Sequence, residues 1–139
     1  MIRKFRTDDL EQVMGLWLAT NISAHDFISA KYWHANYALV KEMLPQANIW
    51  VYEKNNEIWG FIGLQDTYIA GIFVADKAQG KGIGSELLAK AKQQKSQLSL
   101  AVYAKNERAL NFYQRADFTV VNEQLDETTD QVEYLMKWQ

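Results

Sequence analysis

Three glycines in five positions, Gly80, Gly82 and Gly84, stand between a β-rich run that ends at Val74 and a helical pattern that follows. Glycine adopts positive φ freely and lets a ligand approach the main chain closely. A helix N-terminus adds unpaired N–H groups and a partial positive charge. Together these features favour a site for a phosphate or a diphosphate.

The glycine pattern matches neither of two common phosphate loops. A Walker loop requires Lys-Ser or Lys-Thr after its second glycine, and a dinucleotide fold requires G-x-G-x-x-G directly after the strand. Here the pattern is G-x-G-x-G and starts six residues past Val74. Lys77, Gln79 and Lys81 would add donors and charge to a bound phosphate. The alternative interpretation is a flexible helix start that binds no ligand, because short glycine motifs are common.

Other reactive side chains are few. Cysteine is absent, which excludes thiol nucleophiles, cysteine-bound zinc and disulfides. His25 lies between two helical patterns and is either a proton relay near neutral pH or a surface-loop residue. His34 is nine residues away, which is not the spacing of a metal-binding H-E-x-x-H pair. We expect no metal site.

Hydrophobic periodicity predicts the elements that position these residues. Thr7 is the expected N-cap of a first helix, and a second helix runs from about Ser29 to Leu44, where Pro45 ends it. Further helices are expected from the glycine loop to about residue 95 and from Asn106, as N-cap, to about residue 116. Strands are expected at 2–6, 49–53, 58–64, 68–74, 98–103, 118–122 and 132–138.

Two local signals refine this order of elements. Asn55-Asn56 marks a hairpin turn, and Gly71 inside a strand indicates a bulge or a close backbone approach. The order β-α-α-β-β-β-α-β-α-β-β predicts a mixed α/β sheet with helices on both faces.

The bulk composition limits the classes of protein. A length of 139 residues fits one domain, 1–139, and 48% hydrophobic residues supply its core. A formal net charge of −2 argues against a nucleic-acid binder. No run approaches the ~18 apolar residues of a membrane helix, and the basic start lacks the apolar stretch of a signal peptide. We expect a soluble, cytoplasmic monomer or homodimer.

Two motifs resemble one known family, the general N-acetyltransferase (GNAT) superfamily. Residues 79–84, Gln-Gly-Lys-Gly-Ile-Gly, resemble its signature Q/R-x-x-G-x-G/A. Residues 106–113, Asn-Glu-Arg-Ala-Leu-Asn-Phe-Tyr, resemble its second signature, N-x-x-A-x-x-x-Y. The spacing between the motifs and the order of elements are similar to the family along nearly the whole chain.

The resemblance implies a mostly antiparallel sheet, splayed between its fourth and fifth strands, that binds acetyl-CoA as the acetyl donor. The backbone of Ile72, Phe73 and Val74 would lie along the pantetheine arm and the reacting carbonyl. Seven consecutive residues would hold the diphosphate: Gln79, Gly80, Lys81, Gly82, Ile83, Gly84 and Ser85. Asn106 would contact the cofactor near its pantetheine end, and Tyr113 would give a proton to the departing thiolate. Because Asn106 and Tyr113 are seven residues apart, they share a helix face.

Two positions depart from the family pattern. Asp117 stands where the family has glycine, although aspartate tolerates the left-handed conformation. The strand 68–74 lacks the glutamate that serves many members as general base. The candidates for the general base are a water chain, Tyr68, Asp66 and His25. In short relatives a segment similar to His25-Asp26-Phe27 borders the acceptor pocket.

We therefore expect an acetyl-CoA-dependent N-acetyltransferase acting on a primary amine of a small molecule, a peptide N-terminus or a protein lysine. Strand amides near Phe73 and Val74 would hold the oxyanion, and the absence of cysteine favours direct transfer. A non-catalytic acyl-CoA-binding module and a nucleotide-binding protein are the alternatives. Steady release of CoA in the presence of amines would distinguish an enzyme from a binding module. Calorimetry with CoA, ATP and NAD would distinguish a CoA-binding protein from a nucleotide-binding protein.

Overall fold

The computed structural model describes residues 1–139, and a single sheet of seven strands runs through the chain. The strands are β1 (Ile2–Lys4), β2 (Asn48–Lys54), β3 (Glu57–Gln65), β4 (Tyr68–Val74), β5 (Leu98–Tyr103), β6 (Thr119–Asp126) and β7 (Gln131–Trp138). Their spatial order is β1-β2-β3-β4-β5-β7-β6, and only the β4–β5 pair is parallel. The predicted mixed, mostly antiparallel sheet is confirmed.

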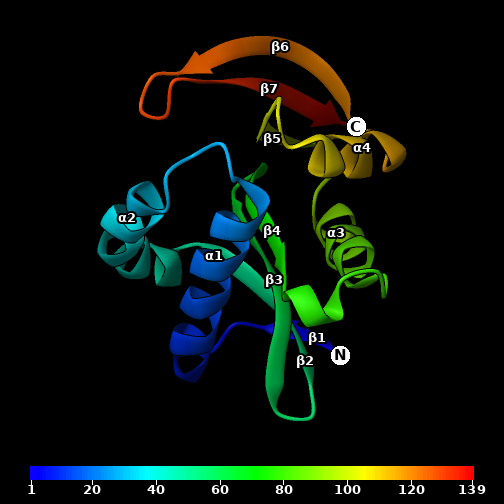
Figure 1. Ribbon diagram of the computed structural model, residues 1–139. Coiled ribbons are helices and arrows are strands. Elements are labelled where there is room, and N and C mark those ends of the chain that lie inside the picture. The colour runs from blue at the N-terminus through cyan, green and yellow to red at the C-terminus, as the bar shows by residue number, and fades with distance from the viewer.

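Helices cover both faces of this sheet (Figure 1). On one face lie α1 (Leu10–Ala24) and α2 (Ala30–Met43), and on the other lie α3 (Ile83–Gln94) and α4 (Glu107–Arg115). Short 3-10 turns at 7–9, 44–46 and 76–78 complete the chain. None of the helices is long and apolar enough to cross a lipid bilayer.

Several local signals read from the sequence have the expected structural effect. The second helix was expected to begin at about Ser29, and Ser29 is its N-cap, because its Oγ accepts a hydrogen bond from the Lys31 amide at 3.3 Å. Asn55 and Asn56 both have positive φ in the tight turn between β2 and β3, a conformation that asparagine tolerates. Pro45 lies in the short turn directly after α2.

The N-terminal cap differs from the prediction. Thr7 lies inside the 3-10 turn, and the Asp9 carboxylate instead accepts a hydrogen bond from the Arg6 amide at 2.8 Å. Asp9 is buried and also pairs with Arg3 at 2.8 Å. The hydrogen bond from Arg3 holds the pKa of Asp9 below its ordinary value. This buried ion pair joins β1 to the start of α1 and overrides the local capping preference.

The hairpin of β6 and β7 is longer than predicted. β6 continues to Asp126 rather than ending near residue 122. It is the edge strand of the sheet and nearly all of its residues are exposed. Without a buried face, its sequence lacks the alternation of apolar and polar residues that marks a strand.

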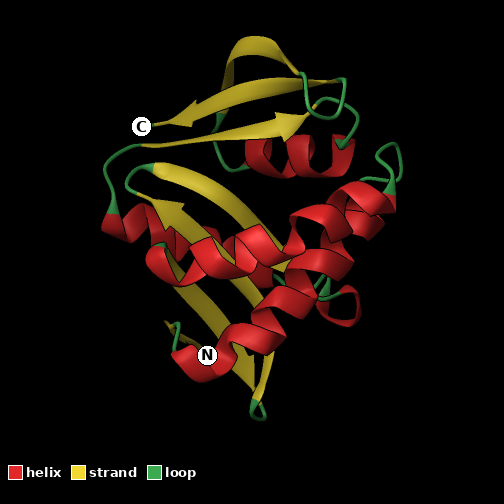
Figure 2. Cartoon of the chain, turned by 90° about the vertical axis from the view of Figure 1, so that its left-hand side faces the viewer, coloured by secondary structure: helices red, strands yellow, loops and turns green.

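The sheet opens between β4 and β5, as the resemblance implied. The two strands pair at Tyr68 and Ser99 only, and beyond that point they separate (Figure 2). Just after this pair, the β3–β4 register shifts by one residue, which leaves Ala70 as a bulge beside Gly71. A bulge bends its strand and increases the twist. A Cβ on Gly71 would lie 2.5 Å from the Phe73 ring, so the predicted bulge and close approach are both present.

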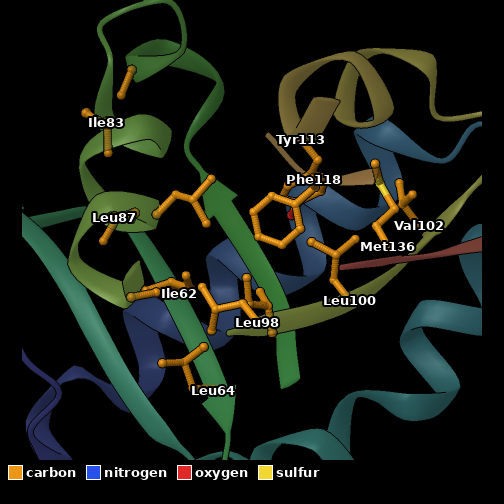
Figure 3. Close-up of a cluster of buried hydrophobic side chains, with 14 residues drawn as sticks. Ile62, Leu64, Ile83, Leu87, Leu98, Leu100, Val102, Tyr113, Phe118 and Met136 are labelled. Carbon is orange, nitrogen blue, oxygen red and sulfur yellow. The ribbon is translucent and has the colours of Figure 1, made fainter. Parts of the chain in front are cut away.

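A cluster of buried apolar side chains keeps the two halves of the opened sheet together (Figure 3). Ile62 and Leu64 come from β3, Leu98 and Leu100 from β5, and Met136 from β7. α3 contacts β3 and β4, whereas α4 contacts β5. The N-termini of α3 and α4 are thereby held on opposite sides of the opening.

Candidate active site

A cleft of about 570 Å³ lies at this opening. Its walls are the end of α1, the second half of β4, the glycine loop with the start of α3, and one side of α4. It brings together every residue predicted for the site except Lys81. Arg108 and Arg115 also line the cleft, and no aspartate or glutamate does. An anionic ligand therefore meets two cations and no opposing carboxylate.

The glycine loop presents a row of free main-chain donors. The amides of residues 80–85 make no hydrogen bond within the chain. Gly80 and Gly82 both have φ of +80°, which glycine adopts without a steric penalty. The Gln79 amide instead donates to the Asp76 carbonyl at 3.3 Å. The set of free amides is thus one residue shorter than predicted at its start, and it suits a diphosphate.

The side chains around the loop are arranged differently from the expectation. Gln79 Nε2 donates to the Val74 carbonyl at 3.2 Å, and Gln79 Oε1 accepts a hydrogen bond from the Arg108 guanidinium. The Lys81 ammonium lies 5.3 Å from the centre of the Trp59 ring, outside the cleft. Lys77 pairs with Glu57. The amides of the loop, rather than its lysines, therefore face the cleft.

The backbone of β4 alternates between β3 and the cleft. The Ala75 amide donates to the Trp59 carbonyl at 2.9 Å, which fixes a hydrogen-bonded pair at the end of the ladder. Antiparallel pairs alternate, so Phe73 bonds to Phe61 opposite it, and the backbone groups of Ile72 and Val74 point away from β3. The hydrogen bond from Gln79 to the Val74 carbonyl agrees with this orientation. The Phe73 amide is therefore directed at β3, and the Val74 amide is the one that faces the cleft.

Tyr113 combines a buried ring with an unpaired hydroxyl. Its side chain is only 7% exposed, and its ring packs edge-on against Phe112 and Phe118. The hydroxyl makes no hydrogen bond within the chain and is not fully enclosed by other atoms. Tyr113 lines the cleft. Burial raises the pKa of this hydroxyl above its ordinary value, with a smaller effect from Tyr68. The hydroxyl is therefore a neutral donor at physiological pH.

Asn106 and His25 connect the two sides of the cleft. Asn106 caps α4, with its Oδ1 accepting from the Ala109 amide at 3.2 Å. Asn106 Nδ2 lies 3.2 Å from His25 Nε2, and His25 Nδ1 lies 3.1 Å from the Asn21 carbonyl. A carbonyl only accepts, so the proton is assigned to Nδ1, and Nε2 accepts from Asn106. The predicted helix cap at Asn106 is confirmed.

His25 is the one candidate base that reaches the cleft. Burial lowers the pKa of its imidazole, so the ring is neutral at physiological pH and retains a lone pair on Nε2. Asp66 lies in the turn at the far end of β4 from Val74, and its side chain is 90% exposed. Tyr68 does not line the cleft, and burial raises the pKa of its hydroxyl, which disfavours the tyrosinate form that a base requires.

Five polar residues of the cleft were not predicted: Thr20, Asn21, Ser23, Arg108 and Arg115. Arg108 and Arg115 flank Phe112 on one side of α4, and their seven-residue spacing was the available signal. Asn21 is buried in α1, where its Nδ2 donates to the Trp17 carbonyl at 2.8 Å. Asn21 occupies the apolar stripe one turn after Trp17, so an amide at a core position was visible in the sequence.

Comparison with known families and sequences agrees with this geometry. Residues 20–132 match the family described as "Acetyltransferase (GNAT) domain". The chain is 35% identical to the peptidyl-lysine N-acetyltransferase YiaC of Escherichia coli (strain K12), over 99% of this chain and 96% of YiaC. It is 30% identical to the peptidyl-lysine N-acetyltransferase YjaB of the same strain, over 86% of this chain and 82% of YjaB.

Solved structures share the fold. The solution structure of apo YjaB from Escherichia coli has a TM-score of 0.87 at 26% identity, over 99% of this chain and 96% of that one. The PaiA N-acetyltransferase of Thermoplasma acidophilum, crystallised with coenzyme A, has a TM-score of 0.85 at 18% identity, with the same two coverages of 99% and 96%. At that identity the second likeness concerns the fold alone.

Proposed function

The chain belongs to the GNAT acetyltransferase family and is an N-acetyltransferase that uses acetyl-CoA, and we propose that its acceptor is the side-chain amine of lysine residues in proteins. Catalysis, rather than acyl-CoA binding alone, follows from the family and from its named enzyme relatives. The choice of acceptor and the roles of individual residues are the proposal.

The separation of charge between the cleft and the hairpin of β6 and β7 carries the proposal for the acceptor. The cleft wall holds two arginines and no carboxylate. Residues 119–138 hold only one basic residue, Lys137, and the following carboxylates: Glu123, Asp126, Glu127, Asp130 and Glu133. A polyanionic donor suits the first surface, and a cationic acceptor suits the second.

Hydrogen bonds tie the acidic hairpin to the histidine side of the cleft. The Tyr103 hydroxyl donates to Asp126 Oδ2 at 2.7 Å, and the hydroxyls of Tyr32 and Thr128 lie 3.3 Å apart. The Tyr103 ring in turn contacts both His25 and Phe27 edge-on. The turn of the hairpin thus reaches the start of α2, next to the segment that carries His25 and Phe27 (Figure 1). A lysine that approaches there passes carboxylates before it reaches the cleft.

Aromatic rings beside His25 add a surface suited to an alkylammonium group. Phe27 and Tyr103 lie 5.9 Å apart between ring centres. The chain's own Lys105 ammonium lies 5.8 Å from the centre of the Phe27 ring, within the range of a cation–π contact. This wall accepts a lysine side chain, because one already rests on it. The names of the two similar E. coli enzymes, both peptidyl-lysine acetyltransferases, support the same acceptor.

The chemistry is direct transfer. The neutral lysine nitrogen bonds to the thioester carbon, and the Val74 amide donates to the oxygen, which becomes negative. When the tetrahedral adduct collapses, the carbon–sulfur bond breaks and Tyr113 donates its hydrogen to the sulfur. The amine loses one proton, CoA leaves as the thiol, and solvent returns a proton to Tyr113. Atoms and charges balance without a covalent enzyme intermediate.

His25 is the proposed acceptor of the amine proton, directly or through water. Its neutral form is favoured by the lowered pKa, so it needs no prior deprotonation. Its Nε2 first has to leave the Asn106 amide, 3.2 Å away. Asn106 Nδ2 would then be free to bond a carbonyl of the pantetheine arm.

The acceptor is tested with matched amines and mass spectrometry. The first substrate is a peptide with a blocked N-terminus and one lysine. The second is the same peptide with a free N-terminus and with its lysine replaced, and the third is spermidine. Acetylation of the lysine peptide at the highest kcat/KM supports the proposal. Faster acetylation of spermidine or of the α-amine would contradict it.

Variants of the hairpin test whether its carboxylates attract the acceptor. Glu127→Gln combined with Asp130→Asn should raise the KM for the lysine peptide several-fold at low salt, because charges at a rim mainly affect association. Glu42→Gln, an exposed change on α2, is the matched control. Equal effects of both variants would remove the acidic hairpin from acceptor recognition.

A further inference from the structure

Two arginines of the cleft have no role in the proposed transfer. Arg108 and Arg115 both line the cleft, and neither forms a salt bridge. Arg108 bonds to Gln79 Oε1, a neutral acceptor, and Arg115 has no hydrogen-bonding partner. Guanidinium groups in a cleft without carboxylates are suited to phosphate oxygens, which they bind through two parallel N–H groups.

The two arginines are placed for two separate anionic groups. Seven residues separate them, so they share a face of α4 and lie about 10 Å apart along its axis. Arg108 contacts the start of the glycine loop through Gln79. Arg115 lies one turn beyond Phe112, whose ring edge lies 3.5 Å from the position of a Cβ on Gly84. The first arginine therefore lies beside the free amides, and the second lies further along the groove between α3 and α4.

Other basic residues near the loop do not share this groove. The ammonium groups of Lys54, Lys77 and Lys81 all lie within 5.6 Å of the Trp59 ring centre, and none of the three lines the cleft. Arg115 also stands in the last turn of α4, where a cation is favoured by the helix dipole. That effect requires a positive charge but no particular ligand, so lysine at position 115 would serve it as well as arginine.

We propose that Arg115 binds the 3′-phosphate of coenzyme A and makes the enzyme selective for acetyl-CoA over its 3′-dephospho analogue. The proposal rests on the placement of the diphosphate at the amides of residues 80–85. A 3′-phosphate is a monoester with a charge near −2 at neutral pH, and it lies beyond the diphosphate when the pantetheine arm points into the opening at β4. Arg108 is left to the diphosphate, which both forms of the coenzyme carry.

A cycle of two protein variants and two ligands tests this assignment. Calorimetry measures binding of CoA and 3′-dephospho-CoA to the unaltered protein and to Arg115→Gln. We expect CoA to bind the unaltered protein about tenfold more tightly than dephospho-CoA, the low end of the factor for one charged hydrogen bond, because Arg115 is exposed. Arg115→Gln should lose about tenfold for CoA and less than twofold for dephospho-CoA. Arg115→Lys, which keeps the helix charge, should retain part of the preference.

Two further variants define the controls. Arg108→Gln should weaken both ligands by similar factors, because both carry the diphosphate. Lys31→Gln removes one positive charge from exposed α2 and should change neither affinity. Thermal melting of each variant verifies that the fold is kept.

The possible results separate this inference from the function on which it rests. Equal losses for both ligands in Arg115→Gln, or no preference for CoA in the unaltered protein, would overturn the assignment of Arg115 alone. Absence of binding for both ligands to the unaltered protein would overturn the placement of acetyl-CoA as well. A selective loss for CoA in Arg108→Gln would exchange the roles of the two arginines.

Discussion

Replacing Tyr113 by phenylalanine removes a single oxygen from the proposed proton donor. The ring is 7% exposed and packs against Phe112 and Phe118, and phenylalanine keeps all of these contacts. The hydroxyl makes no hydrogen bond within the chain, so the change leaves no partner unsatisfied. We expect the free energy of unfolding to stay within about 1 kcal/mol, with a tendency toward stabilisation. Tyr113→Ala would instead cost about 3–5 kcal/mol and is not informative.

The expected loss of turnover follows from the pKa of the hydroxyl. Burial raises that pKa, whereas a thiol has a pKa near 8.5, so full proton transfer before the carbon–sulfur bond breaks is unfavourable. The proton therefore passes to the sulfur only after the carbon–sulfur bond has broken, and the hydrogen bond from Tyr113 to the developing thiolate is what lowers the barrier, by about 1.5–3 kcal/mol. This corresponds to a loss of about 10- to 150-fold in kcat, at the low end of general acid catalysis.

The assay follows thiol release at saturating lysine peptide, with CoA affinity measured independently by calorimetry. A fall in kcat of about 10- to 150-fold with CoA affinity within twofold agrees with this role for Tyr113. An unchanged kcat would exclude Tyr113 from the mechanism. A parallel loss of CoA affinity would show that the hydroxyl acts in binding instead.

Two further changes test the loop and the histidine. Gly82→Ala should lower the free energy of unfolding by about 1–2 kcal/mol and weaken the binding of CoA, because Gly82 has φ of +80°. The control is Gly15→Ala in α1, where a Cβ has open space around it. It should raise the free energy of unfolding by up to about 1 kcal/mol and leave the affinity for CoA unchanged. Urea unfolding and calorimetry measure both, and equal effects would refute the requirement for glycine. His25→Gln tests the lowered pKa of His25. Below about pH 6.5 the unfolded chain binds a proton at His25 more readily than the folded chain does. The contribution of His25 to the free energy of unfolding is therefore complete above about pH 6.5 and falls as the pH drops below it. The variant should lack this component between about pH 5 and 7, and parallel stability curves would contradict the assignment.

The sequence carried much of the fold because its local signals agree with the tertiary structure. The start of the second helix at Ser29 and the cap at Asn106 depend on side chains that bond to nearby backbone amides. The turn at Asn55-Asn56 depends on positive φ, which asparagine tolerates. Thr7 failed as a cap because Asp9 pairs with Arg3, a contact between two elements. The end of β6 was missed because an exposed edge strand has no apolar face to reveal it.

The same distinction applies to the site. The free amides follow from a glycine pattern at a helix start, which is local, and the two signatures placed Tyr113 and Asn106 in the cleft. The orientation of the Phe73 amide toward β3 depends on the register between two strands, which no local pattern determines. The bond between Gln79 and Arg108 joins residues 29 positions apart. Lys81 was expected near the phosphates, but the Trp59 ring holds its side chain elsewhere.

Binding of acetyl-CoA requires that the amides of residues 80–85 hold its diphosphate. A two-dimensional ¹H–¹⁵N spectrum of the protein, titrated with CoA, observes these six groups individually. We predict large shifts for all six, with Gly80, Gly82 and Gly84 resolved among the glycine resonances and Gly15 unmoved as a control. Saturable binding of CoA that shifts other residues and leaves these six amides unperturbed would contradict the account.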